Sequence, residues 1–236
     1  APTRGHNDAR RIVAERSREY ELVVCSGGDG TLDEVVTGMR QSGFRTPIGY
    51  IPAASTNDFG GSLSLPKNMV KAAETAVRGK NFACDIGAFN DDVFVYIAAF
   101  GLFTDVSYET AQDMKNVLGH MAYLLEGVKR LSAVRSFPMK VICEGRVIED
   151  DFIFGMITNS VSVGGFKNIT GKNVRLNDGL FEVTLIRKPK NPVELNNIVI
   201  SLLNRDVDTS AMYCFRAAEI TLESLEPVAW TLDGEN

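Results

Sequence analysis

The stretch Ser26-Gly27-Gly28-Asp29-Gly30-Thr31 joins a short apolar segment, 21–26, to a helical pattern over 32–41. Glycines permit positive φ and a close approach by a ligand, and successive N–H groups ahead of a helix favour an anion. A tight strand-to-helix turn capped by Thr or Asp would show the same pattern without binding anything. Asp29 suits an anion site only when a cation accompanies the phosphate. The turn therefore indicates a metal-bound polyphosphate such as Mg-ATP.

The segments on either side of this turn alternate between helix and strand. Helical spacing covers 7–21, 32–41 and 67–78, whereas short apolar strands cover 21–26 and 47–52. Helices between buried apolar strands are typical of βαβ units. The first part of the chain is therefore predicted to be an α/β domain with a mainly parallel sheet.

The pattern changes near residue 80, after which strands dominate. A hairpin is predicted over 82–100, and two helices, 107–134 and 192–204, interrupt the later strands. Further strands are predicted over 139–143, 147–157, 180–186, 212–216, 219–222 and 228–232. We expect a domain boundary near residue 80, with an α/β domain over 1–80 and a mostly antiparallel β-sandwich over 81–236.

Composition excludes several classes of protein. The 236 residues carry a formal net charge of −5, which argues against nonspecific nucleic-acid binding as the main activity. The longest nearly apolar run, 93–103, is about half of what a bilayer span needs. Two histidines are too few for a His-based zinc site, and four widely spaced cysteines indicate reduced thiols in a cytoplasmic protein.

Four segments together resemble the catalytic domain of diacylglycerol kinases, in particular the bacterial soluble lipid kinases. They are G-G-D-G-T-L-D-E-V-V at 27–36, P-A-A-S-T-N-D-F at 52–59, D-G-L-F-E-V at 178–183 and D-G-E at 233–235. The sequence departs from the family at Asp33, where the family has Asn, and at Ala54-Ser55, where it has Gly-Thr. The family's first strand and its last strands have no counterpart here. The resemblance implies a phosphofructokinase-like nucleotide-binding domain followed by a β-sandwich that takes the lipid.

The same resemblance implies roles for individual residues. Nucleotide contacts are implied at Thr3, Gly27, Gly28, Asp29, Gly30, Thr31, Leu32, Asp33 and Ser55. A catalytic base is implied at Glu235, with Asp29 and Asp105 in the surrounding polar network. A structural Mg²⁺ is implied at Asp178, with main-chain carbonyls of Arg175 and Leu180. Taken without the family, Glu235 reads as a solvated turn acid and Asp178 as part of an ordinary D-G turn.

The implied activity is transfer of the ATP γ-phosphoryl group to a lipid hydroxyl, with diacylglycerol as the first acceptor and phosphatidic acid as product. Alternatives are kinases of a sphingoid base, phosphatidylglycerol or a polyprenol, and a noncatalytic nucleotide or lipid sensor. The expected partners are ATP, Mg²⁺ and a lipid substrate at the inner face of the membrane, with peripheral binding and no nucleic acid. An edge strand could pair two copies into a homodimer. The helix over 107–134 suits either a core-facing stripe or a membrane surface.

Overall fold

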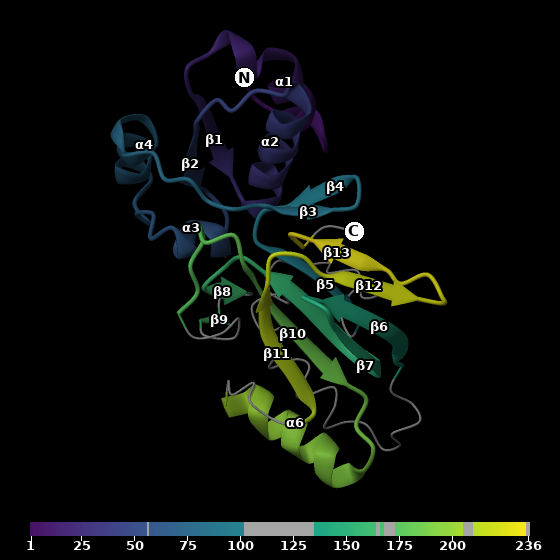
Figure 1. The fold of residues 1–236 in the computed structure, drawn as a ribbon. Helices are drawn as coiled ribbons and strands as arrows, with labels where there is room; N and C mark the ends of the chain where they lie inside the picture. The colour runs from purple at the N-terminus through teal and green to yellow at the C-terminus, as the bar shows by residue number, and fades with distance from the viewer. Residues whose placement is uncertain (56, 102–134, 164–165, 168–172, 205–209, 235–236) are drawn as a thin grey trace. The chain divides into compact units, whose positions relative to one another are not determined.

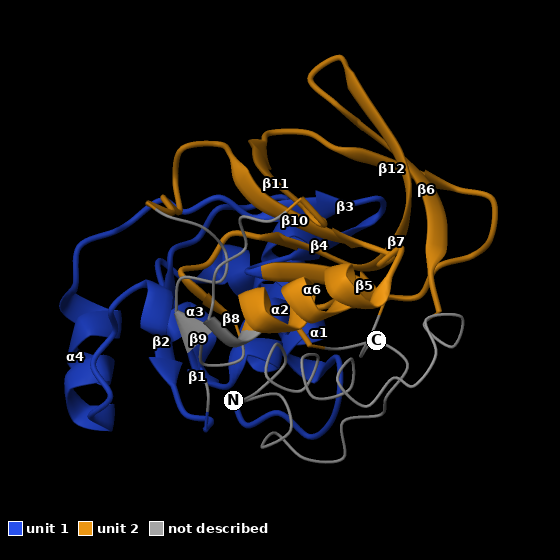
Figure 2. Ribbon diagram, turned by 90° about the horizontal axis from the view of Figure 1, so that it is seen from below, with its two compact units in different colours: residues 1–96 blue, residues 97–236 orange. Residues whose placement is uncertain are grey.

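The computed structural model describes residues 1–55, 57–101, 135–163, 166–167, 173–204 and 210–234 (Figure 1). The chain divides into two compact units, Ala1–Tyr96 and Ile97–Asn236 (Figure 2). The helix predicted over 107–134 lies outside the described residues. Within the described ranges, no helix has the length and apolarity that crossing a bilayer requires.

Unit 1 contains a βαβ crossover, as its sequence predicts. Strands β1 (Val23–Gly27) and β2 (Ile48–Pro52) pair in parallel, with Cys25 opposite Tyr50. Helix α2 (Asp29–Ser42) connects them. The remaining elements before residue 80 are α1 (Asp8–Arg16), η1 (Ser17–Glu19), α3 (Asp58–Ser62) and α4 (Met69–Arg78). The prediction of an α/β fold for this part of the chain is therefore confirmed.

Helices α1 and α2 are joined closely at two points. The carboxylate of Glu34 accepts the N–H of Asn7 at 2.8 Å and that of Ala9 at 3.0 Å, so a side chain of α2 caps the start of α1. Further along α2, a Cβ atom placed on Gly38 would lie 2.3 Å from the carbonyl oxygen of Arg10. The helices can approach this closely because position 38 has no side chain.

The hairpin predicted over 82–100 is divided between the two units. Strands β3 (Gly87–Phe89) and β4 (Asp92–Phe94) form a short antiparallel pair in unit 1, and β5 (Ile97–Gly101) belongs to unit 2. Arg40 of α2 donates to the carbonyl oxygen of Asp92 at 2.9 Å, which ties the hairpin to unit 1. Unit 1 consequently extends to Tyr96, about sixteen residues beyond the boundary expected from the change in sequence pattern.

Unit 2 is built on a seven-stranded sheet in which every pairing is antiparallel. The long strand β7 (Arg146–Thr158) is central and pairs with β5, β6 and β10. The other strands of this sheet are β6 (Phe137–Cys143), β10 (Phe181–Arg187), β11 (Met212–Ala217), β12 (Thr221–Ser224) and β13 (Trp230–Leu232). A two-stranded pair, β8 (Ser162–Val163) with β9 (Phe166–Lys167), and helix α6 (Pro192–Asn204) complete the unit. The mostly antiparallel second domain is confirmed.

The core of unit 2 forms on the buried side chains of this sheet. Phe100, Phe152, Ile153, Leu185 and Ile186 are fully buried. Trp230 packs against Phe100 with ring centroids 4.7 Å apart. The strand pattern read from the sequence thus supplies a continuous apolar centre.

The contact at Gly38 makes a prediction about stability. Gly38→Ala should destabilise the protein by about 1–3 kcal/mol, because the added methyl group meets the rigid backbone of α1 and outweighs the gain in helix propensity. Gly61→Ala is the matched control, since a Cβ atom at this helical glycine meets nothing within 4 Å. Denaturant unfolding of both variants tests this, and equal midpoints for the two would contradict the close helix contact.

Candidate functional site

Two neighbouring side chains pack tightly against the glycine turn after β1. A Cβ atom on Gly27 would lie 2.7 Å from the side chain of Thr31, and one on Gly28 would lie 2.9 Å from the Cβ of Ala54. Neither glycine has a positive φ, and Gly28 is extended with φ −86° and ψ −175°. Of the two properties of glycine that the sequence analysis names, these positions therefore use the small size and not the positive φ. They are needed because two neighbouring side chains close in on the turn.

Helix α2 starts directly after this turn and has no side-chain cap. Its N-cap residue is Gly28, and the first backbone bond of the helix runs from the N–H of Leu32 to the carbonyl of Gly28 at 3.1 Å. The N–H groups of Asp29, Gly30 and Thr31 come before that bond, at the positive end of the helix dipole. A fourteen-residue helix beginning in this way offers the donor groups that bind phosphate.

Asp29 joins this turn to the next one. Its Oδ1 accepts from the hydroxyl of Tyr50 at 3.2 Å, and its Oδ2 accepts from the N–H of Asp58 at 2.8 Å. Burial raises the pKa of Asp29 to about 6, although the N–H of Asp58 acts in the opposite direction. Both carboxylate oxygens thus have protein partners, and the group titrates just below neutral pH.

The second turn, 52–59, lies beside the first. The N–H of Ala53 donates to the carbonyl of Gly27 at 2.8 Å. Asn57 closes the loop from a left-handed conformation, φ 51°, by accepting from the N–H of Ala54 and donating to its carbonyl oxygen. Ala54, which stands where the family has glycine, has no positive φ, so alanine causes no backbone strain there. Ser55 is exposed in this loop and follows Ala54, whose Cβ lies beside Gly28.

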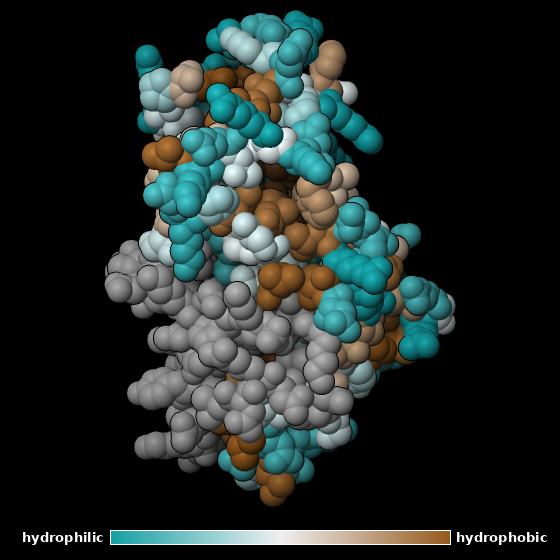
Figure 3. All heavy atoms as spheres, turned by 90° about the vertical axis from the view of Figure 1, so that its left-hand side faces the viewer, coloured by the Kyte–Doolittle hydropathy of each residue, from teal (hydrophilic) through white to brown (hydrophobic). Residues whose placement is uncertain are grey.

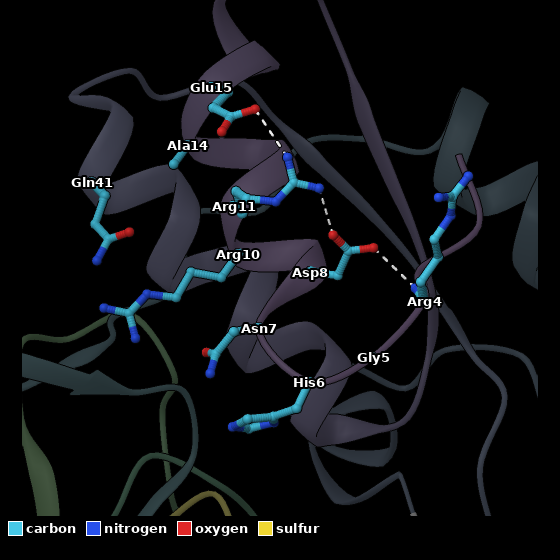
Figure 4. Close-up of a pocket in the computed structure, with 10 residues that line it drawn as sticks. All are labelled: Arg4, Gly5, His6, Asn7, Asp8, Arg10, Arg11, Ala14, Glu15 and Gln41. Atoms are coloured by element: carbon cyan, nitrogen blue, oxygen red, sulfur yellow. Dashed lines mark hydrogen bonds and ion pairs between the residues drawn. The ribbon is translucent and has the colours of Figure 1, made fainter.

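Thr3 lies in the exposed segment before α1, next to a polar pocket of about 670 Å³ (Figure 4). Figure 4 shows the guanidinium of Arg11 between Asp8 and Glu15, at 2.6 Å and 3.3 Å respectively. Both carboxylates of this pocket therefore pair with Arg11. The segment is held by the contacts of Glu34 with the backbone of Asn7 and Ala9.

Asp178 lies in unit 2 and pairs with an arginine that the sequence interpretation missed. Arg216 donates to Asp178 Oδ2 at 2.6 Å and to Glu182 Oε1 at 3.2 Å. Burial tends to raise the pKa of Asp178, but the hydrogen bonds from Arg216 and from the N–H of Leu180 outweigh it and hold that pKa below its usual value. The pairing depends on the β10–β11 register, in which Glu182 lies opposite Arg216, and no local sequence signal reveals it.

These surroundings bear on the metal predicted at Arg175, Asp178 and Leu180. A carboxylate with two carbonyl oxygens is a donor set that Mg²⁺ accepts. Here, however, the guanidinium of Arg216 already matches the charge of that carboxylate. In the described part of the chain, no group of three or more His, Cys, Asp or Glu side chains is placed to hold a metal ion. The residues as they stand do not fit a metal, and the predicted ion stays a prediction of the resemblance.

The last predicted segment, D-G-E, begins with a firmly held turn. The N–H of Asp233 donates to the carbonyl of Ile97 at 2.8 Å, and its Oδ1 accepts from the N–H of Ile97 at 3.0 Å. Asp233 and Gly234 both have positive φ, 52° and 86°. The buried Asp233 therefore secures the end of β13 to the start of β5. Glu235 and Asp105, predicted to act in catalysis, lie outside the described residues.

Sequence reasoning missed three residues that shape the site in unit 1. They are Glu34, Tyr50 and Asn57. Glu34 and Asn57 lie inside the quoted motifs, so their presence was visible although their contacts were not. Tyr50 gave no signal beyond an apolar strand pattern.

Comparison with known proteins covers almost the whole chain. Residues 1–89 match the family model "Diacylglycerol kinase catalytic domain", and residues 99–236 match "YegS C-terminal NAD kinase beta sandwich-like domain". The diacylglycerol kinase of Bacillus subtilis strain 168 is 30% identical over 230 residues, covering 97% of this chain and 76% of that protein. That of Staphylococcus carnosus strain TM300 is 31% identical over 229 residues, covering 97% and 73%.

A solved structure has a similar fold. The crystal structure of a diacylglycerol kinase from Bacillus anthracis strain Sterne matches with a TM-score of 0.79 and 25% identity, over 99% of this chain and 77% of that one. The β-sandwich-like match of residues 99–236 agrees with the antiparallel sheet of unit 2. Because the motif turns, the fold and the full-length relatives agree, this chain belongs to the diacylglycerol kinase family.

Proposed function

We propose that this protein transfers the γ-phosphoryl group of ATP to the hydroxyl group of a membrane lipid, with diacylglycerol as acceptor and phosphatidic acid as product. The observation that carries this proposal is the uncapped N-terminus of α2, which follows two glycines and is joined to the 52–59 turn through Asp29. Two motif turns brought together in this way form a phosphate-binding surface, and the relatives named above are diacylglycerol kinases.

The proposed nucleotide site is formed by the residues predicted from the sequence. The N–H groups at the start of α2 would bind phosphate oxygens, and the exposed hydroxyls of Ser55 and Thr3 would add contacts. Asp29 would keep the two turns in place through Tyr50 and Asp58. Because an ionised Asp29 repels phosphate, we propose that ATP binds together with Mg²⁺. The chemistry that Mg²⁺ supplies when bound is neutralisation of phosphate charge.

Glu235 is proposed as the general base. It would take the proton of the lipid hydroxyl while that oxygen forms its bond to the γ-phosphorus and the bond to the β-phosphate oxygen breaks, releasing ADP. Asp105 is proposed to belong to the surrounding polar network. No step of this reaction is assigned to a metal at Asp178, because Arg216 already pairs with that carboxylate.

The acceptor is in a membrane, so the proposed reaction requires reversible contact with a lipid surface on the cytoplasmic side. None of the described residues encodes the choice of acceptor. A kinase for another lipid hydroxyl would use the same phosphate site. One argument for a noncatalytic sensor was that alanine replaces the family's glycine at position 54. This argument no longer holds, because Ala54 adopts an unstrained conformation.

A lipid panel tests the proposed reaction directly. Purified protein is incubated with γ-labelled ATP and Mg²⁺ and with detergent-dispersed diacylglycerol, a sphingoid base, phosphatidylglycerol or a polyprenol. We expect label in phosphatidic acid above all other products. Label in another lipid would correct the acceptor, whereas ATP-dependent thermal stabilisation without any labelled lipid would favour the sensor.

Replacing the proposed base separates chemistry from nucleotide binding. Glu235→Gln should lower turnover by at least about 10²-fold, because the hydroxyl loses its proton acceptor, and should leave ATP-induced thermal stabilisation unchanged. Glu226→Gln, which changes an exposed acid of unit 2, is the matched control and should retain activity. Full turnover in Glu235→Gln would remove the base assignment.

The raised pKa of Asp29 predicts how pH affects nucleotide binding. Between pH 5 and pH 7 the carboxyl loses its proton near pH 6, so its negative charge increasingly repels phosphate. Affinity for ATP without Mg²⁺ should therefore fall with rising pH in the wild type, relative to Asp29→Asn. The variant is the required reference because the terminal phosphate of ATP titrates over the same range.

Isothermal titration at pH 5, 6 and 7 measures this difference, and Mg²⁺ should reduce it. Asn keeps the hydrogen bond from the N–H of Asp58, and its amide group can donate to the oxygen of Tyr50, so the turn is preserved. Parallel pH profiles for the two proteins would show that Asp29 does not face the phosphates.

A further inference from the structure

Helix α4 has its larger apolar side chains on the outside. The residue that it buries completely is Ala72, and Ala76 lies so close to β2 that a Cβ atom on Gly49 would be 2.5 Å from its carbonyl oxygen. Met69, Val70 and Val77 are 48%, 68% and 61% exposed. A helix that only covers a sheet turns its largest apolar residues inward. The opposite arrangement here leaves an apolar surface that the described residues do not cover.

This helix is firmly formed, so its exposed side chains are held in place. The side chain of Asn68 caps the first turn by accepting from the N–H groups of Val70 and Lys71, both at 3.1 Å. At the other end, the N–H of Gly79 donates to the carbonyl of Thr75 at 2.8 Å. Both ends are thus satisfied, and the outward face is a stable feature of unit 1.

Basic residues flank the exposed apolar ones and outnumber the single exposed acid of this helix, Glu74. Val70 and Val77 lie on one side of the helix, since residues seven apart share a face, and Met69 directly precedes Val70. We define the α4 surface as Lys67, Met69, Val70, Lys71, Val77, Arg78 and Lys80. Among the described residues, none of its four cations forms an ion pair, whereas the whole chain has a net charge of −5. Figure 3 views the side from which α4 projects in Figure 1, and it shows brown apolar groups among teal polar ones on unit 1.

The combination of charge and exposed apolar groups selects one kind of partner. An anionic bilayer complements the four cations and also accepts the apolar side chains at its interface. A second copy of this chain, meeting the first through the same surface, would bring two sets of four cations together. A free anion would leave Met69, Val70 and Val77 in water.

We propose that the α4 surface docks unit 1 on an anionic lipid bilayer. This inference deepens the proposed function, because it names the surface through which a lipid kinase would reach its membrane. The docking needs neither ATP nor the acceptor lipid. It can therefore be tested separately from phosphoryl transfer.

The first experiment measures binding of the wild-type chain to sucrose-loaded vesicles in a sedimentation assay, without ATP and without diacylglycerol. Vesicles of phosphatidylcholine with 40% phosphatidylglycerol are compared with vesicles of phosphatidylcholine alone. We expect binding to the anionic vesicles that weakens with added salt, and much weaker binding to the neutral ones. Equal partitioning onto both vesicle types, or onto neither, overturns the proposal.

Two pairs of substitutions locate the contact. Val70→Glu with Val77→Glu should abolish vesicle binding, because each change removes an apolar group and adds repulsion. The matched control is Val193→Glu with Leu225→Glu, which makes the same change of charge at residues that are 70% and 99% exposed elsewhere. The control pair should retain most of the binding. Similar losses in both pairs would show a general effect of charge and overturn the α4 assignment.

A milder pair, Lys67→Gln with Lys71→Gln, removes charge without touching the apolar residues. Each lost cation should weaken binding about fivefold, so the pair should lose on the order of 25-fold. Wild-type affinity in this pair overturns the proposal even if the glutamate variants fail to fold. Turnover with detergent-dispersed lipid is measured in parallel. It should persist in the lysine pair, so an inactive wild type that still binds vesicles contradicts only the proposed function.

Discussion

The arrangement of unit 1 depends on one half-buried carboxylate. Asp29 follows β1, and its oxygens accept from the hydroxyl of Tyr50 on β2 and from the N–H of Asp58 at the start of α3. Burying a carboxylate is costly unless its oxygens are hydrogen-bonded, and here both of them are. The carboxyl ends of adjacent parallel strands lie at the same edge of a sheet, and Asp29 joins the two turns that leave that edge. The proposed phosphate surface depends on this bond network, because the network holds the two turns together.

Much of the motif at 27–36 therefore serves folding as well as binding. Its glycines leave room for Thr31 and Ala54, its Asp joins two turns, and its Glu34 caps the neighbouring helix α1. The N–H groups at the start of α2 are the part of this motif that we propose for the ligand. A phosphate site of this type is a small region of main chain, and most of the motif's side chains act by setting its shape.

The sequence was sufficient to predict the structural features that depend on local pattern. The parallel pair β1–β2, the turn between strand and helix and the antiparallel second domain follow from apolar runs and glycine positions. It was insufficient to predict contacts between segments that are distant along the chain. The pairing of Arg216 with Asp178 requires the β10–β11 register, and the bond from Arg40 to Asp92 joins α2 to a hairpin about fifty residues further along the chain. Neither contact leaves a trace in the spacing of residues along the chain.

Strand β2 links the two surfaces of unit 1 that we have assigned to ligands. Consecutive residues of a strand face opposite sides, and here Gly49 lies against α4 while Tyr50 bonds to Asp29. Helix α4 packs closely against the strand at Gly49, and the hydrogen bond of Tyr50 joins the proposed phosphate turn to that same strand. Membrane docking through α4 would therefore hold the start of α2 at a constant height above the bilayer. A lipid hydroxyl, which projects only a short way from the membrane surface, requires a phosphate donor held at such a height.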